Sequence, residues 1–249
     1  MAYDTWVESL QGDSSHRAVG IHASELKCVR KVVYTLLDTP KKSRMRKVWR
    51  QRMEQGKAVH TMLQRDFKKM AEASNGLMEF QEEVAISPHL KSVAEELSIY
   101  SSADGVFTFR EVKGGPITLR VGLEIKTESP DAYAKLIAPR PDHIEQAHVY
   151  MKCLDLPLMW FLYFNKGNQN NTTSSHPFLI TFDEKIWEGI AKRCNLSLSF
   201  ADAYPHTKEL PGREEGVHCE FCSYSWACKP NYLEKRNAPR WAPIPGVGV

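Results

Sequence analysis

The sequence lacks a long uninterrupted run of apolar residues, so no membrane-spanning helix is expected. The first ten residues carry Asp4 and Glu8 and lack a basic start followed by an apolar stretch, which argues against a secretory signal. No internal repeat appears, and 249 residues suit one well-buried core, with or without a small appendage, better than two full domains. We therefore expect a folded cytoplasmic protein that has no membrane partner.

Cysteine is scarce, with six residues in the whole chain. Disulfides are rare in a reducing compartment, so these cysteines are not expected to form a disulfide framework, and metal binding, catalysis or plain burial are left as their uses. Cys219, Cys222 and Cys228 form a C-x2-C-x5-C group, while Cys28 lies far away in the sequence. A zinc ribbon normally shows two close C-x2-C pairs, so this spacing favours an iron-sulfur cluster over zinc.

The net charge of +3 conceals an uneven distribution of charge. Residues 27–69 hold 14 Lys and Arg against three acids, a charge of +11 that leaves −8 for the rest of the chain. One electropositive face is therefore expected, and its natural partner is a polyanion. A solvated basic helix would show the same run of charge. The densest part of the window could follow phosphates along a nucleic acid, and it contains Lys41, Lys42, Arg44, Arg46, Lys47, Arg50 and Arg52.

The spacing of apolar residues predicts a mixture of helices and strands. Helices are expected over 23–37, 53–70, 142–154 and 183–204, and strands over 82–86, 97–110, 117–127, 158–164 and 178–182. Ser24 and Asp183 are candidate N-caps, and Asp142 with Glu145 resembles a capping box. On these boundaries a core occupies 1–205, a cysteine-rich segment follows over 206–236, and a mobile tail covers 237–249.

The strand expected over 117–127 alternates cleanly and carries a possible catalytic pair. Glu124 and Lys126 lie two residues apart, so both project from the polar face of a rigid support. A carboxylate can hold a divalent cation that lowers the pKa of a bound water, and a lysine can orient that water or neutralise charge on a phosphate. The turn at Gly114 and Gly115 folds the preceding strand back alongside, where Asp104 could share the metal. An E-x-K triplet by itself also fits a surface ion pair.

Four short motifs follow one another along the chain: Gly56-x3-His60, Asp104-Gly105, Glu124-Ile125-Lys126 and Gln146-x3-Tyr150. The ordered set resembles the RecB-like branch of the PD-(D/E)XK nucleases, which includes the CRISPR-associated RecB-like exonucleases and the nuclease parts of AddB and of eukaryotic replication helicase-nucleases. The resemblance covers roughly residues 21–228. It implies an α/β, restriction-endonuclease-like core, with a central mixed β-sheet flanked by helices, and a cysteine-rich C-terminal cluster region.

The resemblance also implies a role for each matching residue. The matching metal ligands and catalytic residues are His60, Asp104, Glu124, Lys126 and the backbone carbonyl of Ile125. Gln146 and Tyr150 match a motif that positions the DNA strand or the lysine, and helical spacing puts both on one face. Because an imidazole ligand favours Mn²⁺ over Mg²⁺, we expect Mn²⁺ to be the preferred of the two ions.

In the same nucleases, one N-terminal cysteine and a C-terminal C-x2-C-x5-C group surround a [4Fe-4S] cluster. The resemblance therefore assigns a cluster to Cys28, Cys219, Cys222 and Cys228, with zinc as the alternative. Such a site would join the two ends of the chain and act as a structural staple, not as a catalyst. The remaining pair, Cys153 and Cys194, fall on apolar helix positions and are expected to be buried thiols.

These features predict a divalent-metal-dependent DNA nuclease that acts in replication, recombination or repair, with a phage-type enzyme as one form of it. Exonuclease action on single-stranded or end-containing duplex DNA is favoured over sequence-specific cutting, because nothing in the chain looks like a base-reading module. A non-catalytic DNA-binding protein with a structural cluster is the alternative. A hydrolase for small phosphoesters is disfavoured by the basic window. Trp49 in that window either stacks on a base or packs in the core.

Overall fold

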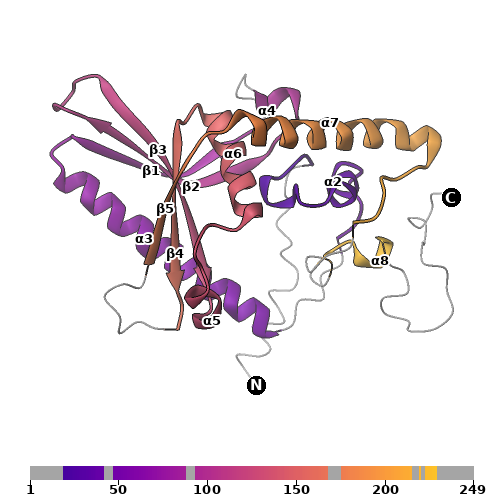
Figure 1. Ribbon diagram of the computed structural model, residues 1–249, viewed down its shortest axis with the longest axis horizontal. Helices are drawn as coiled ribbons and strands as arrows, with labels where there is room; N and C mark the ends of the chain where they lie inside the picture. The colour runs from indigo at the N-terminus through magenta and orange to yellow at the C-terminus, as the bar shows by residue number, and fades with distance from the viewer. Residues whose placement is uncertain are drawn as a thin grey trace.

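A computed structural model describes residues 19–41, 47–87, 93–167, 175–214, 219 and 222–228. Its centre is a mixed five-stranded sheet in the order β1-β2-β3-β4-β5, in which only β3 and β4 run parallel among the paired neighbours. Helices lie on both sides of this sheet (Figure 1). The strands are β1 Met78–Ile86, β2 Ser101–Arg110, β3 Ile117–Glu128, β4 Leu158–Asn165 and β5 Ser175–Thr181.

The longest helices are α3 on one side of the sheet and α7 on the other (Figure 1). The helical elements are η2 Ala23–Glu25, α2 Val29–Leu36, α3 Lys47–Ala73, α4 Val93–Glu96, α5 Pro130–Ala134, α6 Pro141–Leu154, α7 Glu184–Thr207 and α8 Ser225–Cys228. This arrangement confirms the expected α/β class. Among the described residues, no helix is both long and apolar enough to cross a bilayer.

Strand β3 shows how the sequence produces the two-sided core. Val121, Leu123 and Ile125 are buried with Phe67 of α3 on one face, as the alternation predicts. On the opposite face, α6 packs through residues such as Val149 against a larger core that includes Phe161 of β4. The strand is therefore covered on both sides, which holds its backbone rigidly between α3 and α6.

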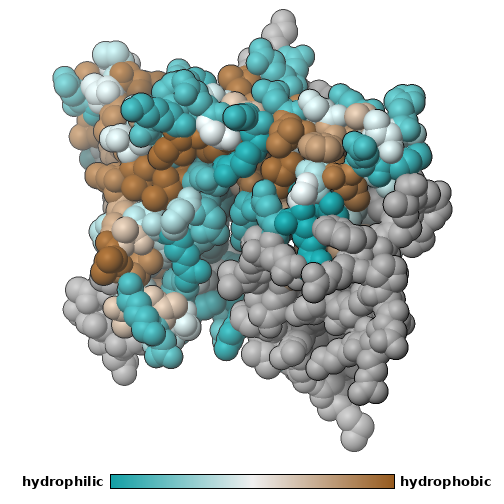
Figure 2. All heavy atoms as spheres, turned by 45° about the vertical axis from the view of Figure 1, so that its right-hand side comes forward, coloured by the Kyte–Doolittle hydropathy of each residue, from teal (hydrophilic) through white to brown (hydrophobic). Residues whose placement is uncertain are grey.

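Not all of the large apolar side chains are buried in the core. Several large apolar side chains stay exposed, among them Ile117 at the start of β3, Leu179 on the edge strand β5, and Ile137 after α5. Figure 2 shows a face on which a band of hydrophilic side chains separates two hydrophobic areas. Scattered exposed apolar residues of this kind are normal for a folded domain.

Three local predictions were wrong. Ser24 is not an N-cap, because it lies inside η2, whose N-cap is His22. The helix expected over 23–37 is interrupted, because the short η2 turn ends at Glu25 and Cys28 is an extended N-cap of α2, with φ −149° and ψ 106°. The break lets the buried Glu25 carboxylate fold back onto α2, where it accepts a hydrogen bond from Thr35 Oγ1 at 3.0 Å and pairs with Lys31 Nζ at 3.2 Å. These bonds satisfy a buried charge that a continuous helix would leave unpaired.

The capping box expected at the start of α6 does not form. Arg140 is the N-cap, and Pro141 occupies the first turn. Asp142 pairs with Lys27 at 3.5 Å, and Glu145 pairs with an arginine of α7 at 2.8 Å. Tertiary ion pairs thus take both side chains away from the helix end. The cap of α7 is confirmed, since the Asp183 side chain accepts from the Lys185 backbone N–H at 2.8 Å.

A glycine-to-alanine change at Gly122 tests how closely β3 and β4 pack. A Cβ at Gly122 would lie 1.9 Å from Met159 Sδ and 3.0 Å from Leu156 Cδ1, so we expect the variant Gly122→Ala to lose free energy of unfolding. The expected loss is about 1–3 kcal/mol, measured by urea denaturation. The control Gly189→Ala lies within α7, where no described atom outside the neighbouring helix backbone comes within 4 Å of the new Cβ, and should gain up to about 1 kcal/mol. An unchanged Gly122→Ala would show that Met159 moves aside without cost.

Candidate active site

The candidate site lies where β2 and β3 part. Their last ladder pair is Gly105 with Leu123, and beyond it the carboxylate of Asp104 takes the place of a backbone partner. Asp104 Oδ2 accepts the backbone N–H of Ile125 at 2.6 Å. The side chain predicted to bind metal is therefore inserted between the two strands, next to the E-x-K triplet of β3.

Glu124 and Lys126 project from β3 on the side opposite the α3 packing face. Lys126 Nζ lies 2.6 Å from Glu124 Oε1 and donates a hydrogen bond to Gln146 Oε1 at 3.0 Å. The Gln146 amide in turn donates to the hydroxyl of Tyr150, one turn further along α6. Gln146 and Tyr150 are both buried, so in this structure they contact the lysine network, and a direct contact with DNA stays a prediction.

His60 reaches the same place from α3. Its Nδ1 lies 3.2 Å from Asp104 Oδ1, which brings the predicted imidazole and one predicted carboxylate into contact. Gly56, one turn earlier, is buried, and a Cβ there would lie 3.2 Å from Thr127 Oγ1 of β3. The small residue lets α3 approach β3 closely enough for His60 to reach Asp104.

The charges in this site influence one another. Burial raises the pKa of Glu124 to about 7, although the nearby Lys126 acts to lower it. Burial acts to lower the pKa of Lys126, but the charge of Glu124 outweighs it and the net pKa is raised. For His60 the hydrogen bond and charge of Asp104 likewise outweigh burial and raise the pKa of the imidazole. A bound cation would therefore change the protonation and the ion pairing of Glu124, Lys126 and His60.

The surroundings of one buried carboxylate oxygen indicate whether a cation fits this site. Glu124 is 3% exposed, and among the described atoms its Oε2 has no hydrogen-bond partner. A buried carboxylate oxygen without a donor needs a proton or a cation, and the adjacent oxygen and imidazole ligands suit a hard divalent ion. In the described part of the chain, however, no three His, Cys, Asp or Glu side chains are already gathered into a metal-binding group. His60 pairs with Asp104 and Glu124 with Lys126, so binding would exchange these contacts.

The predicted DNA-binding residues of the basic run are placed only in part. Arg50 and Arg52 lie in the first turns of α3, half-buried and exposed respectively. Arg44 and Arg46 lie outside the described residues, as does the tail over 237–249. Lys47 begins α3, but its side chain and that of Trp49 also lie outside the description. Contact between these residues and phosphate stays a prediction.

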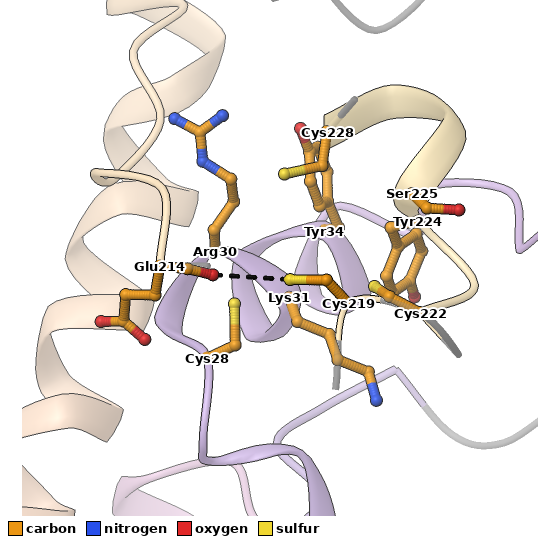
Figure 3. A pocket seen from close by; sticks show the side chains of 10 residues that line it. All are labelled: Cys28, Arg30, Lys31, Tyr34, Glu214, Cys219, Cys222, Tyr224, Ser225 and Cys228. Atoms are coloured by element: carbon orange, nitrogen blue, oxygen red, sulfur yellow. Dashed lines mark hydrogen bonds between the residues drawn. The ribbon is translucent and has the colours of Figure 1, made fainter. Parts of the chain in front are cut away.

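The four cysteines of the proposed cluster line one pocket. Figure 3 shows Cys28 extending from the start of α2 on one side of the pocket, with Cys219, Cys222 and Cys228 on the other. Burial raises the pKa of Cys28, Cys222 and Cys228. The other two cysteines are away from this pocket, with Cys194 fully buried in α7 and Cys153 half-buried in α6.

Aromatic and polar contacts hold the cysteine-bearing segment against α2. The rings of Tyr34 and Tyr224 lie 5.4 Å apart, and the Tyr224 hydroxyl is 3.0 Å from Thr35 Oγ1. Trp226 Nε1 donates to the carbonyl of Pro40 at 3.1 Å. The segment that carries three of the cysteines is thus docked by groups other than its thiols.

No protein-family model matches the chain, and no curated protein matches it significantly in sequence. Solved structures do match. An alkaline exonuclease from Laribacter hongkongensis, LHK-Exo, aligns with a TM-score of 0.53 at 14% identity, over 80% of this chain and 93% of that one. This chain shares the fold of that exonuclease. LHK-Exo in complex with dAMP aligns at 0.51 and 15% identity, over 74% and 88% of the two chains. The protein SSO0001 aligns at 0.50 and 16% identity, over 92% and 96%.

The sequence motifs did not identify two residues that lie near Asp104. Gln64 of α3 and Glu83 of β1 are hydrogen-bonded to each other, and Gln64 also bonds the Asp104 backbone. The only available signal was the spacing of Gln64, four residues after His60 and therefore on the same face of α3. Nothing in the local sequence marks Glu83, because its place beside Gln64 and Asp104 depends on the pairing of β1 with β2.

Removing the amine of Lys126 should make the free energy of unfolding depend more strongly on pH than it does in wild type. Glu124 has a folded pKa of about 7, above its ordinary value of 4.5, so its burial destabilises the fold increasingly as pH rises through that interval. The variant Lys126→Met removes the opposing charge, so the pKa of Glu124 should rise further. We expect a small loss at pH 5 and a loss at pH 8 that is larger by up to about 1.4 kcal/mol, the limit set by the one pH unit between the pKa of about 7 and pH 8.

The measurement is urea denaturation at both pH values. The control is Lys152→Met, which removes a partly exposed ion pair with Glu184 and should change stability by less than about 1 kcal/mol at either pH. Equal losses at pH 5 and pH 8 in Lys126→Met would contradict the assignment of Glu124 as a buried carboxylate that depends on this amine.

Proposed function

We propose that this protein is a divalent-metal-dependent DNA nuclease. The observation that carries the proposal is the buried Glu124 carboxylate, with an oxygen that lacks a described partner, beside Lys126, Asp104 and His60. The fold shared with an exonuclease supports a nuclease more than a small-molecule hydrolase. The ordered motifs support the RecB-like branch of the PD-(D/E)XK nucleases, to which the proposal assigns the chain.

In the proposed hydrolysis of a phosphodiester, each residue of the site has a separate role. His60, Asp104, Glu124 and the carbonyl of Ile125 would hold a divalent cation, which when bound lowers the pKa of water and neutralises charge on the phosphate. Lys126 presents its ammonium group to the attacking water or to the phosphate oxygens. Gln146 accepts a hydrogen bond from Lys126 and so aims the amine, and Tyr150 fixes Gln146 in turn. Preorganised donors of this kind cost little rearrangement during the reaction.

The proposed substrate is DNA with a free end, either single-stranded or duplex, in replication, recombination or repair. LHK-Exo is named an alkaline exonuclease, and one of its structures is a complex with dAMP. The basic residues at the start of α3 precede His60 on the same helix, which would bring the phosphate backbone towards the site. Mn²⁺ is proposed as the preferred ion over Mg²⁺, because an imidazole belongs to the ligand set.

The proposal extends to a [4Fe-4S] cluster held by Cys28, Cys219, Cys222 and Cys228, with zinc as the less favoured occupant. Its support is that these four thiols line one pocket, although they come from opposite ends of the chain. Because a site of this kind would bridge α2 and α8, it would stabilise the fold by joining distant segments.

Cleavage of labelled DNA tests the nuclease proposal. Wild type with Mn²⁺ should degrade single-stranded or end-containing duplex DNA, and Glu124→Ala and Lys126→Ala should each lose at least about 100-fold in rate. Both variants should keep DNA binding, measured by fluorescence anisotropy, since neither residue belongs to the basic run. Lys152→Ala serves as a surface control with unchanged cleavage.

Two outcomes would contradict the nuclease proposal. Tight DNA binding by wild type without cleavage in Mn²⁺ or Mg²⁺ would favour the non-catalytic DNA-binding alternative. Full cleavage by Glu124→Ala would place the reaction at another site.

Replacing one thiol tests the cluster. Cys219→Ser should lower the melting temperature and the visible absorbance of the purified protein together, because the same bond would hold the metal and join the segments. Cys153→Ser, outside the pocket, should leave the absorbance unchanged. A colourless wild type that contains one zinc per chain would overturn the iron assignment, and a metal-free wild type with a normal melting temperature would overturn both.

A further inference from the structure

Strand β1 contains an irregularity directly opposite Asp104. The register of β1 and β2 is continuous from Met78 to Ile86, yet the ladder omits the pair that Glu83 and Asp104 would form. Glu83 has a φ of 48°, in the left-handed region that residues other than glycine rarely adopt. Strain of this kind persists only where surrounding contacts hold it, and it concentrates at functional sites.

Gln64 from α3 bonds to both sides of this interruption. Its side chain is buried, and its Nε2 donates to the backbone carbonyl of Asp104 at 2.8 Å and to Glu83 Oε1 at 2.9 Å. The other oxygen of Glu83 accepts from Ser102 Oγ at 3.2 Å. A helix side chain thus joins two neighbouring strands at the one position where their ladder is interrupted.

As a result, every oxygen of Asp104 has a defined partner. The backbone carbonyl accepts from Gln64, Oδ2 accepts from the Ile125 N–H, and Oδ1 lies beside His60. Gln64 and His60 are four residues apart on α3, so one face of a single helix contacts the aspartate at its backbone and at its carboxylate. A cation bound between His60 and Asp104 would replace their mutual contact but leave the Gln64 bond in place.

We propose that Gln64, supported by Glu83, is a positioning residue that holds the backbone of Asp104 at the distance from α3 at which His60 and the Asp104 carboxylate share one divalent ion. This inference rests on the proposed function. Outer groups that orient a metal ligand typically affect metal affinity or activity by about 10–100-fold when they are removed.

The test measures Mn²⁺ binding directly, by the electron paramagnetic resonance of free Mn²⁺, alongside cleavage of DNA. Gln64→Leu keeps the approximate size of the side chain and removes both hydrogen bonds. We expect a dissociation constant for Mn²⁺ about 10–100-fold above that of wild type, with DNA binding measured without Mn²⁺ unchanged. Gln81→Leu, at an exposed glutamine of the same β1 strand, should bind Mn²⁺ like wild type.

A double variant that keeps the net charge distinguishes an effect of Gln64 on the metal site from an effect on folding stability. In the double variant Gln64→Glu with Glu83→Gln, the new amide can donate to the new carboxylate across the same contact, but the Asp104 carbonyl loses its donor. We expect the melting temperature to recover towards wild type while Mn²⁺ affinity stays at least about 10-fold weaker. Recovery of both together would show that Gln64 acts only through stability, and would overturn the proposal.

Other outcomes are equally decisive. Wild-type Mn²⁺ affinity in folded Gln64→Leu would overturn the inference and leave the nuclease proposal standing. A wild type that neither binds Mn²⁺ nor cleaves DNA would defeat the nuclease proposal itself. If Gln64→Leu fails to fold, the exchange variant decides, since it retains the link between α3 and β1.

Discussion

The site depends on one buried carboxylate. Glu124 lies within the central sheet at 3% exposure, where an unpaired charge would cost several kilocalories per mole. The Lys126 amine offsets that cost, and its side chain is itself only 21% exposed and needs acceptors. Gln146 supplies one acceptor, and Tyr150 then fixes the amide of Gln146. The series of hydrogen bonds from Lys126 through Gln146 to Tyr150 therefore follows from burying the Glu124 carboxylate away from water.

The sheet topology explains why these groups meet. Because β3 and β4 are parallel neighbours, the chain must cross back over the sheet between them, and α6 lies in that crossover. The helix covers the face from which Glu124 and Lys126 project, so Gln146 contacts Lys126 and Tyr150 contacts Gln146. On the opposite face, Leu123 and Ile125 pack in the core beneath α3. One strand thus provides both the apolar anchoring and the chemical groups.

The cysteine pocket is built on different physical grounds. The tilted rings of Tyr224 and Tyr34 pack together, and Arg30 Nε donates to the carbonyl of Pro211 at 2.7 Å, so aromatic packing and hydrogen bonds hold this region to α2. Helix α2 packs in turn against α7, on the side of the sheet away from α3 (Figure 1). A staple at this pocket would therefore support the helical layer behind the site, whereas Gln64 and His60 contact Asp104 from the α3 side.

Local pattern determined much of this protein. The alternation of β3, the hairpin turn before it and the Asp183 cap of α7 are all readable in the sequence, because each depends on residues within one element. The order of the motifs in the sequence likewise pointed to His60, Asp104, Glu124 and Lys126. Only the structure decided the break before Cys28, where the buried Glu25 bonds to Lys31 and Thr35, and the cap at Arg140, where Asp142 and Glu145 form long-range ion pairs. It also decided the insertion of Gln64 beside Asp104, since a bond between residues 40 positions apart depends on the path of the whole chain.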